Sequence, residues 1–129
     1  MHISVDTNDR RPIYEQVMDE IRNLIARGEL REGAALPPVR QLAADLGVNL
    51  NTIATAYREL QAEGLLTIRH GSGAVVAART TRETGEVSAD ELRRTLRGAL
   101  TRMALAGMPR AVILSAVTEE LRALFGRGR

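Results

Sequence analysis

The sequence predicts a mainly α-helical fold with a small β wing, followed by a two-helix tail. Three observations lead to this prediction. Apolar residues recur at helical spacing on both sides of a short turn at 47–49. Two β-branched runs separated by glycines follow within 65–77. After a polar stretch at 79–87, two more amphipathic helical patterns fill 88–129.

The composition excludes several classes of protein. The 129 residues suffice for one domain, or for one small domain with an appendage. The sequence has no cysteine, which suits a reducing compartment, and its start lacks the charged and apolar regions of a secretory signal. There is also no apolar run of membrane-spanning length. We therefore expect a cytoplasmic protein with no membrane partner.

Charge is unevenly distributed along the chain. All 18 basic residues are arginine and the formal net charge is +2. Residues 1–78 hold 8 arginines against 10 acidic residues, net −2, and residues 79–129 hold 10 against 6, net +4. Global charge thus does not indicate nucleic-acid binding, and any such case must rest on the local placement of side chains.

The first quarter of the chain predicts one helix. Ile3 and Val5 alternate with polar residues, which indicates a short edge strand. Pro12 is suited to a first helical turn, and an apolar stripe then continues to about Arg27. Gly28 ends this helix. The stripe consists of Ile13, Val17, Ile21, Leu24 and Ile25.

A second helix follows a glycine-flanked loop. In this loop Leu30 and Leu36 are expected core anchors, and Pro37-Pro38 restarts a helix. Arg40 points toward solvent or a ligand. The residues expected to face inward are Val39, Leu42, Ala43 and Leu46.

The next turn predicts a third helix packed against the second. Gly47 stands where a left-handed residue ends a helix, and Asn49 stands where a side-chain oxygen caps the next one. This third helix is expected over about Leu50–Glu63, with its apolar side formed by Ile53, Ala56, Tyr57 and Leu60. Two short helices joined so closely form a helix-turn-helix.

The outer face of the third helix is polar and mostly uncharged, because Asn51, Thr55 and Arg58 lie opposite the apolar stripe. Asparagine can donate and accept toward adenine, and a threonine methyl can meet a thymine methyl in the major groove. The alternative is that this is the solvated face of any amphipathic helix.

A β hairpin follows the third helix directly. Leu65–Arg69 and Ala74–Ala77 are the strands, and 70–73 is the glycine-rich tip. A hairpin in this place is a wing, so 1–78 is predicted to be a winged helix-turn-helix. Arg69 and His70 would then approach a phosphate or the minor groove, or would simply form a solvated hairpin edge.

Ordered motifs extend over about residues 10–76. In chain order they are Pro12-Ile13-Tyr14-Glu15-Gln16, Gly28-x-Leu30-x-x-Gly33-x-x-Leu36-Pro37-x-x-Arg40-x-Leu42-Ala43, Leu46-Gly47-Val48-Asn49-x-Asn51-Thr52, Ala56-Tyr57-x-x-Leu60, Glu63-Gly64-Leu65 and Arg69-x-Gly71-x-Gly73. These motifs resemble the GntR family of bacterial transcription regulators, which implies a winged helix-turn-helix that binds DNA. The short tail and the Val48-Asn49-x-Asn51-Thr52 form resemble its YtrA-like subgroup, which implies two small dimerising helices.

The resemblance also implies roles for single residues. Arg40 would contact phosphate or a base, the start of the third helix would enter the groove, and Gly71 would be the wing tip. The chain departs from the family pattern at Pro38, often serine, and at Leu50, often arginine or proline. The expected DNA-binding residues are Arg40, Asn49, Leu50, Asn51, Thr52, Thr55, Arg58, Arg69, His70 and Gly71.

The tail is predicted to form a linker at 79–87 and a helical dimerisation region at 88–129. Ser88 and Glu91 make a capping box, and Pro109 starts the last helix. These helices carry more apolar surface than they can bury alone, which favours a homodimer, whereas closure of a monomeric core is the alternative. The expected dimerisation residues are Leu92, Leu96, Leu100, Met103, Val112, Ile113, Val117, Leu121, Leu124 and Phe125.

Other chemistry finds no support in the sequence. His2 and His70 are the only histidines, no metal-ligand spacing occurs, and Ser72 between two strands is not a nucleophile elbow. We expect no enzyme, cofactor or metal. In some GntR-type proteins the domain is fused to an aminotransferase-like domain, but this chain ends after two helices with no cofactor lysine.

The predicted function is a homodimeric, sequence-specific DNA-binding transcription regulator, acting as a repressor at a pseudo-palindromic operator in double-stranded DNA. A small-molecule effector of unknown identity could lodge between the tail and the winged domain. The alternative function is a protein-interaction module that uses the winged fold as a scaffold without specific DNA binding, and the net −2 of residues 1–78 favours it.

Overall fold

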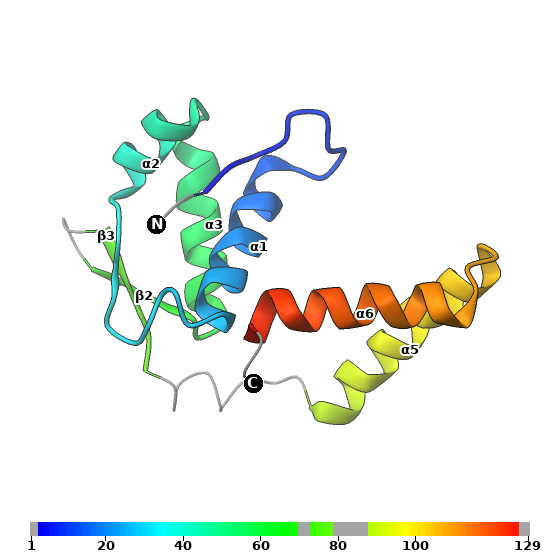
Figure 1. Cartoon of the computed structure of the whole chain (residues 1–129). Helices are drawn as coiled ribbons and strands as arrows, with labels where there is room; N and C mark the ends of the chain where they lie inside the picture. The colour runs from blue at the N-terminus through cyan, green and yellow to red at the C-terminus, as the bar shows by residue number, and fades with distance from the viewer. Residues whose placement is uncertain (1–2, 70–72, 79–87, 127–129) are drawn as a thin grey trace. The chain divides into compact units, whose positions relative to one another are not determined.

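A computed structural model of the chain describes residues 3–69, 73–78 and 88–126 (Figure 1). The chain divides into two compact units, Met1–Gly85 and Glu86–Arg129. The first unit contains α1 (Ile13–Ala26), β1 (Ala35–Leu36), α2 (Val39–Leu46), α3 (Leu50–Ala62), β2 (Leu66–Arg69) and β3 (Gly73–Val76). The second contains α5 (Ala89–Leu105) and α6 (Arg110–Phe125). The predicted fold class, mainly α with a small β wing, is confirmed.

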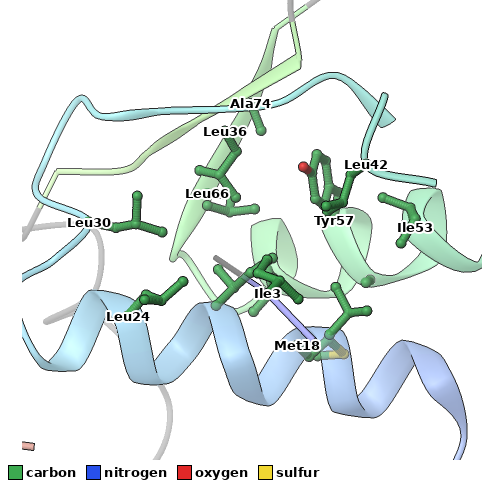
Figure 2. Packing of buried hydrophobic residues seen from close by; sticks show 14 of the residues in the cluster. Ile3, Met18, Leu24, Leu30, Leu36, Leu42, Ile53, Tyr57, Leu66 and Ala74 are labelled. Carbon is green, nitrogen blue, oxygen red and sulfur yellow. The ribbon is translucent and has the colours of Figure 1, made fainter. Parts of the chain in front are cut away.

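The core of the first unit forms around α3, which contacts α1, α2 and β2. The four residues of its predicted apolar stripe, Ile53, Ala56, Tyr57 and Leu60, have no solvent exposure. Figure 2 shows Ile53 and Tyr57 among side chains from α1, α2 and the sheet. The predicted core anchors Leu30 and Leu36 are also buried, as are Leu42 and Ala43 of α2. Helical periodicity therefore identified the core correctly.

The wing is part of a three-stranded antiparallel sheet in the order β1-β3-β2. In the β2–β3 hairpin, Leu66 lies opposite Val76 and Arg69 lies opposite Gly73. Leu66 and Val76 are buried, whereas Arg69 is exposed. The predicted hairpin is thus confirmed, although its tip, 70–72, lies outside the described residues.

The third strand of the sheet is not where the sequence placed it. The edge strand expected at Ile3 and Val5 is wrong, and Ala35–Leu36 pairs with β3 instead. The backbone of the N-terminal segment bonds to a side chain of α1: Gln16 Oε1 accepts from the Asp6 amide at 2.8 Å, and Gln16 Nε2 donates to the Asp6 carbonyl at 3.1 Å. Ile3 is buried without sheet pairing.

The second unit consists of two helices whose starts match the prediction. Ser88 Oγ accepts from the Glu91 amide at 3.1 Å and caps α5, and Pro109 is the N-cap residue of α6. No residue of either helix is buried. The predicted linker, 79–87, lies outside the described residues. None of the helices in the described ranges combines the length and apolar composition needed to cross a membrane.

Candidate nucleic-acid interface

The start of α3 is held by the turn that precedes it. Gly47 adopts a left-handed conformation, with φ of 67°, and ends α2. Two residues later Asn49 caps α3, because its Oδ1 accepts from the Asn51 amide at 2.8 Å. Both sequence predictions for this turn are confirmed. A cap of this kind stabilises a helix by about 1 kcal/mol and fixes the direction in which its first turn points.

The cap gives Asn49 and Asn51 different roles at this turn. Bidentate reading of adenine needs both the oxygen and the amide nitrogen of a side chain. The Oδ1 atom of Asn49 is already engaged by the Asn51 amide. The side chain of Asn51 is exposed and has no hydrogen-bond partner among the described residues. Asn51 is therefore the better placed of the two for adenine.

The remaining predicted residues of α3 lie on and beside its outward face. Arg58 is exposed and its Nη2 lies 3.4 Å from Thr55 Oγ1, so the two side chains touch at the edge of hydrogen-bonding distance. Thr52 and Thr55 are half-buried. Leu50, the first residue of α3, has 45% of its surface exposed. With Asn51, these side chains supply amide, hydroxyl, guanidinium and aliphatic groups.

Arg40 lies in the first turn of α2 and is exposed, with no ion pair to any described residue. The junction before it is anchored to α3, since Tyr57 Oη donates to the Pro37 carbonyl at 2.7 Å. The N-cap residue of α2 is Pro38, which gives no side-chain cap. The first amides of this helix therefore leave donors available beside the Arg40 guanidinium.

The wing is connected to α3 by a side chain that the sequence did not single out. Gln61 Oε1 accepts from the Ile68 amide at 2.7 Å, which occupies a donor on the outer edge of β2. Arg69 follows on the same strand and is exposed. The predicted contacts His70 and Gly71 lie outside the described residues.

Close packing also joins β3 to the start of α2. Gly73 has a φ of 84°, and a Cβ atom there would lie 3.0 Å from the Leu36 carbonyl oxygen and 3.2 Å from the Pro38 nitrogen. Only glycine fits this position without strain. The bonds of Gln61 and Tyr57 and this contact together link α2, α3 and the wing.

Ion pairs with arginine involve four acidic residues of the first unit: Asp9, Asp19, Glu29 and Glu63. Arg22 of α1 binds Glu63 at the end of α3, with Nε 2.9 Å from Oε1, and also binds Asp19 at 2.9 Å. The bond to Glu63 is the main reason why the pKa of Arg22 is raised. Arg11 binds Asp9, and this bond lowers the pKa of the Asp9 carboxyl. The arginines of these ion pairs are Arg11, Arg22 and Arg27, and Arg40 takes part in none of them.

The second unit exposes half of the ten residues predicted for dimerisation. Leu92, Leu96, Val112, Leu121 and Phe125 have between 46% and 57% of their surface exposed. The other five are half-buried: Leu100, Met103, Ile113, Val117 and Leu124. Among the described residues, no group of three or more His, Cys, Asp or Glu side chains could hold a metal ion.

Comparison with known proteins agrees with this geometry. A helix-turn-helix followed by a hairpin defines a winged helix-turn-helix protein. The model of the gntR family of bacterial regulatory proteins matches residues 13–76. The HTH-type transcriptional repressor YtrA of Bacillus subtilis (strain 168) is 35% identical over 88 residues, which cover 67% of this chain and 68% of YtrA. The chain belongs to the gntR family, and it is a DNA-binding transcription regulator rather than an enzyme.

Solved structures extend the similarity beyond the winged unit. A transcriptional antiterminator from Listeria monocytogenes EGD-e has a TM-score of 0.83 at 26% identity, covering 98% of this chain and 95% of its own. YtrA from Sulfolobus acidocaldarius, a GntR-family transcription factor, has a TM-score of 0.61 at 38% identity over 77% and 97%. AraR(DBD) in complex with operator ORX1 has a TM-score of 0.54 at 30% identity over 60% and 99%.

Proposed function

We propose that this chain is a homodimeric repressor that binds a pseudo-palindromic operator through the start of α3. The observation that carries the proposal is the exposed first turn of α3, where the cap fixes Asn51 with its side chain unpaired among described residues. Asn51 would read adenine in the major groove, with Thr52 and Thr55 beside it. The operator complex of AraR(DBD) supports this role for the winged unit.

The arginines around this turn would position the protein on the phosphate backbone. Arg40 is free of ion pairs with described residues and lies beside uncapped amides, a combination that suits an anionic oxygen. Arg58 and Arg69 are exposed on α3 and β2. In the same proposal Asn49 and Leu50 enter the groove, and His70 and Gly71 form the wing tip. Such contacts release counterions, so binding should weaken steeply with salt.

Dimerisation would cover the apolar side chains of α5 and α6. Seven large apolar residues of these helices have between 46% and 82% of their surface exposed in the single chain, and no residue of either helix is buried. An isologous pairing of two copies would remove this surface from water. Two recognition helices would then meet half-sites one helical turn apart, roughly 34 to 36 Å.

A repressor of this design would act in the cytoplasm and could respond to a small molecule. A calorimetric screen of candidate metabolites against the protein and its operator would test for such an effector. A candidate that binds the protein without changing operator affinity is not an effector.

The test of the proposal is selection of bound genomic DNA followed by sequencing, combined with sedimentation analysis of the free protein. We expect a recurrent inverted repeat and a dimer at micromolar concentration. Recovery of no preferred sequence, alongside retention of a protein partner by the immobilised chain, would instead favour an interaction module. A monomer bound to a single half-site would remove the dimer from the proposal.

A further inference from the structure

Leu50 differs from the other leucines of the described part of the first unit. It is 45% exposed, and it does not belong to the core or to the residues packed against it. Each of the others is buried or packs against the core: Leu24, Leu30, Leu36, Leu42, Leu46, Leu60, Leu65 and Leu66. A single exposed leucine is common on protein surfaces, so its placement decides whether it has a role.

That placement is the first residue of α3. Leu50 lies between the capping residue Asn49 and the exposed Asn51, and the bond from the Asn51 amide to Asn49 Oδ1 holds the backbone on both sides of it. The Leu50 side chain lies about 100° around the helix axis from that of Asn51, so it borders the face that Asn51 presents at the exposed end of α3. It lies outside the core, which α3 enters through residues further along the helix, beginning with Ile53.

The chemistry of an aliphatic side chain then limits what Leu50 can recognise. It can neither donate nor accept a hydrogen bond, so it has no match for the N7 and O6 acceptors of guanine or the N4 donor of cytosine. The C5 methyl group of thymine is the one apolar feature that base pairs present in the major groove. Contact between the two would remove apolar surface of both from water.

We propose that Leu50 is a specificity-determining residue that selects thymine at one position of each half-site by covering its C5 methyl group. This inference rests on the proposed operator binding. An arginine at this position would recognise a base through hydrogen bonds, whereas Leu50 would recognise it through apolar contact alone. A consequence is that the position should discriminate thymine from uracil, which differ only in that methyl group.

The experiment replaces each thymine of the selected operator in turn with deoxyuridine and measures affinity by fluorescence anisotropy at fixed salt. For the wild type we expect one thymine per half-site at which the change weakens binding about threefold, and about tenfold when both half-sites carry it. Leu50→Ala should bind both operators equally, and Leu50→Met, which stays apolar, should retain the discrimination. Asn23→Ala, an exposed asparagine of α1, serves as the control and should behave like the wild type.

Several results would overturn the inference. One is a wild-type protein that binds its operator specifically but is insensitive to deoxyuridine at every thymine, which leaves the proposed function intact. Equal sensitivity in the wild type and Leu50→Ala is another. Absence of any sequence-specific binding by the wild type would remove the proposed function as well. As a second measurement, repeated DNA selection with Leu50→Arg should shift the preference at this position from thymine toward guanine, and an unchanged preference counts against the role of Leu50.

Discussion

Replacing Tyr57 with phenylalanine tests how α3 is coupled to the start of α2. The Tyr57 hydroxyl donates to the Pro37 carbonyl at 2.7 Å, and the side chain has no solvent exposure. Phenylalanine keeps the ring and removes only this bond. The net value of such a bond is about 0.5 to 1.5 kcal/mol, and the carbonyl left without its partner adds to the loss. We expect Tyr57→Phe to lower the free energy of unfolding by about 1 to 2 kcal/mol at pH 7.5.

The same residue makes the difference between the two proteins depend on pH. Burial raises the pKa of the Tyr57 phenol above its ordinary value of 10.0. As the pH rises past 10, this phenol therefore ionises in the unfolded chain while it stays protonated in the folded protein. The folded protein's advantage is complete below pH 10 and is lost as pH rises, by about 1.4 kcal/mol for each unit above 10. Near pH 11 the loss in the free energy of unfolding of the wild type should about equal the contribution of the hydrogen bond. The wild type and Tyr57→Phe should then be about equally stable.

Urea unfolding followed by circular dichroism at 222 nm, at pH 7.5 and pH 11, measures both values. Tyr14→Phe alters the one other tyrosine of the sequence and controls for the loss of a phenol without the Pro37 bond. A Tyr57→Phe protein as stable as the wild type at pH 7.5 would refute the energetic role of this bond. A stability difference that stays the same at pH 11 would refute the burial of the phenol.

Three further predictions concern the connections around the interface. Gly33→Ala should destabilise the fold by roughly 1 to 2 kcal/mol because of its positive φ, and Gly73→Ala should destabilise it by more. Of the two, only an added Cβ at position 73 would meet backbone atoms, and melting curves of both variants would measure the difference. Gln61→Met should speed hydrogen exchange at the Ile68 amide, whereas Gln61→Glu, which keeps an acceptor, should preserve its protection. Asn49→Ala should cost about 1 kcal/mol in urea unfolding and Asn49→Ser little, because serine also caps helices.

The sequence predicted those features that depend on neighbouring residues. The left-handed Gly47 and the Asn49 cap follow from local backbone chemistry, and both are confirmed. Apolar periodicity identified the buried side of α3 because side-chain direction along a helix is fixed. The predicted edge strand at Ile3 and Val5 failed because alternation over three residues cannot tell sheet pairing from simple burial.

What the sequence did not predict depends on contacts between distant segments. A two-residue strand at Ala35–Leu36 has no pattern of its own and exists because β3 offers a free edge. The bond from the Ile68 amide to Gln61 joins a helix to a strand, and no spacing rule indicates it. Within the candidate site, the sequence named Asn49 both as a cap and as a DNA contact, and only the geometry shows which atom the cap uses.

Operator binding by Arg40→Ala and Asn51→Ala, each compared with a matched control, tests the central claim most directly. Arg31→Ala and Asn23→Ala are the controls, since both residues are exposed and lie outside α2 and α3. In a gel shift over a salt series we expect Asn51→Ala to lose about 1 to 3 kcal/mol of binding energy, and Arg40→Ala to reduce the salt slope by about 1. Melting temperatures should change little. Wild-type affinity and salt slope in both variants would contradict the assignment of DNA recognition to this face.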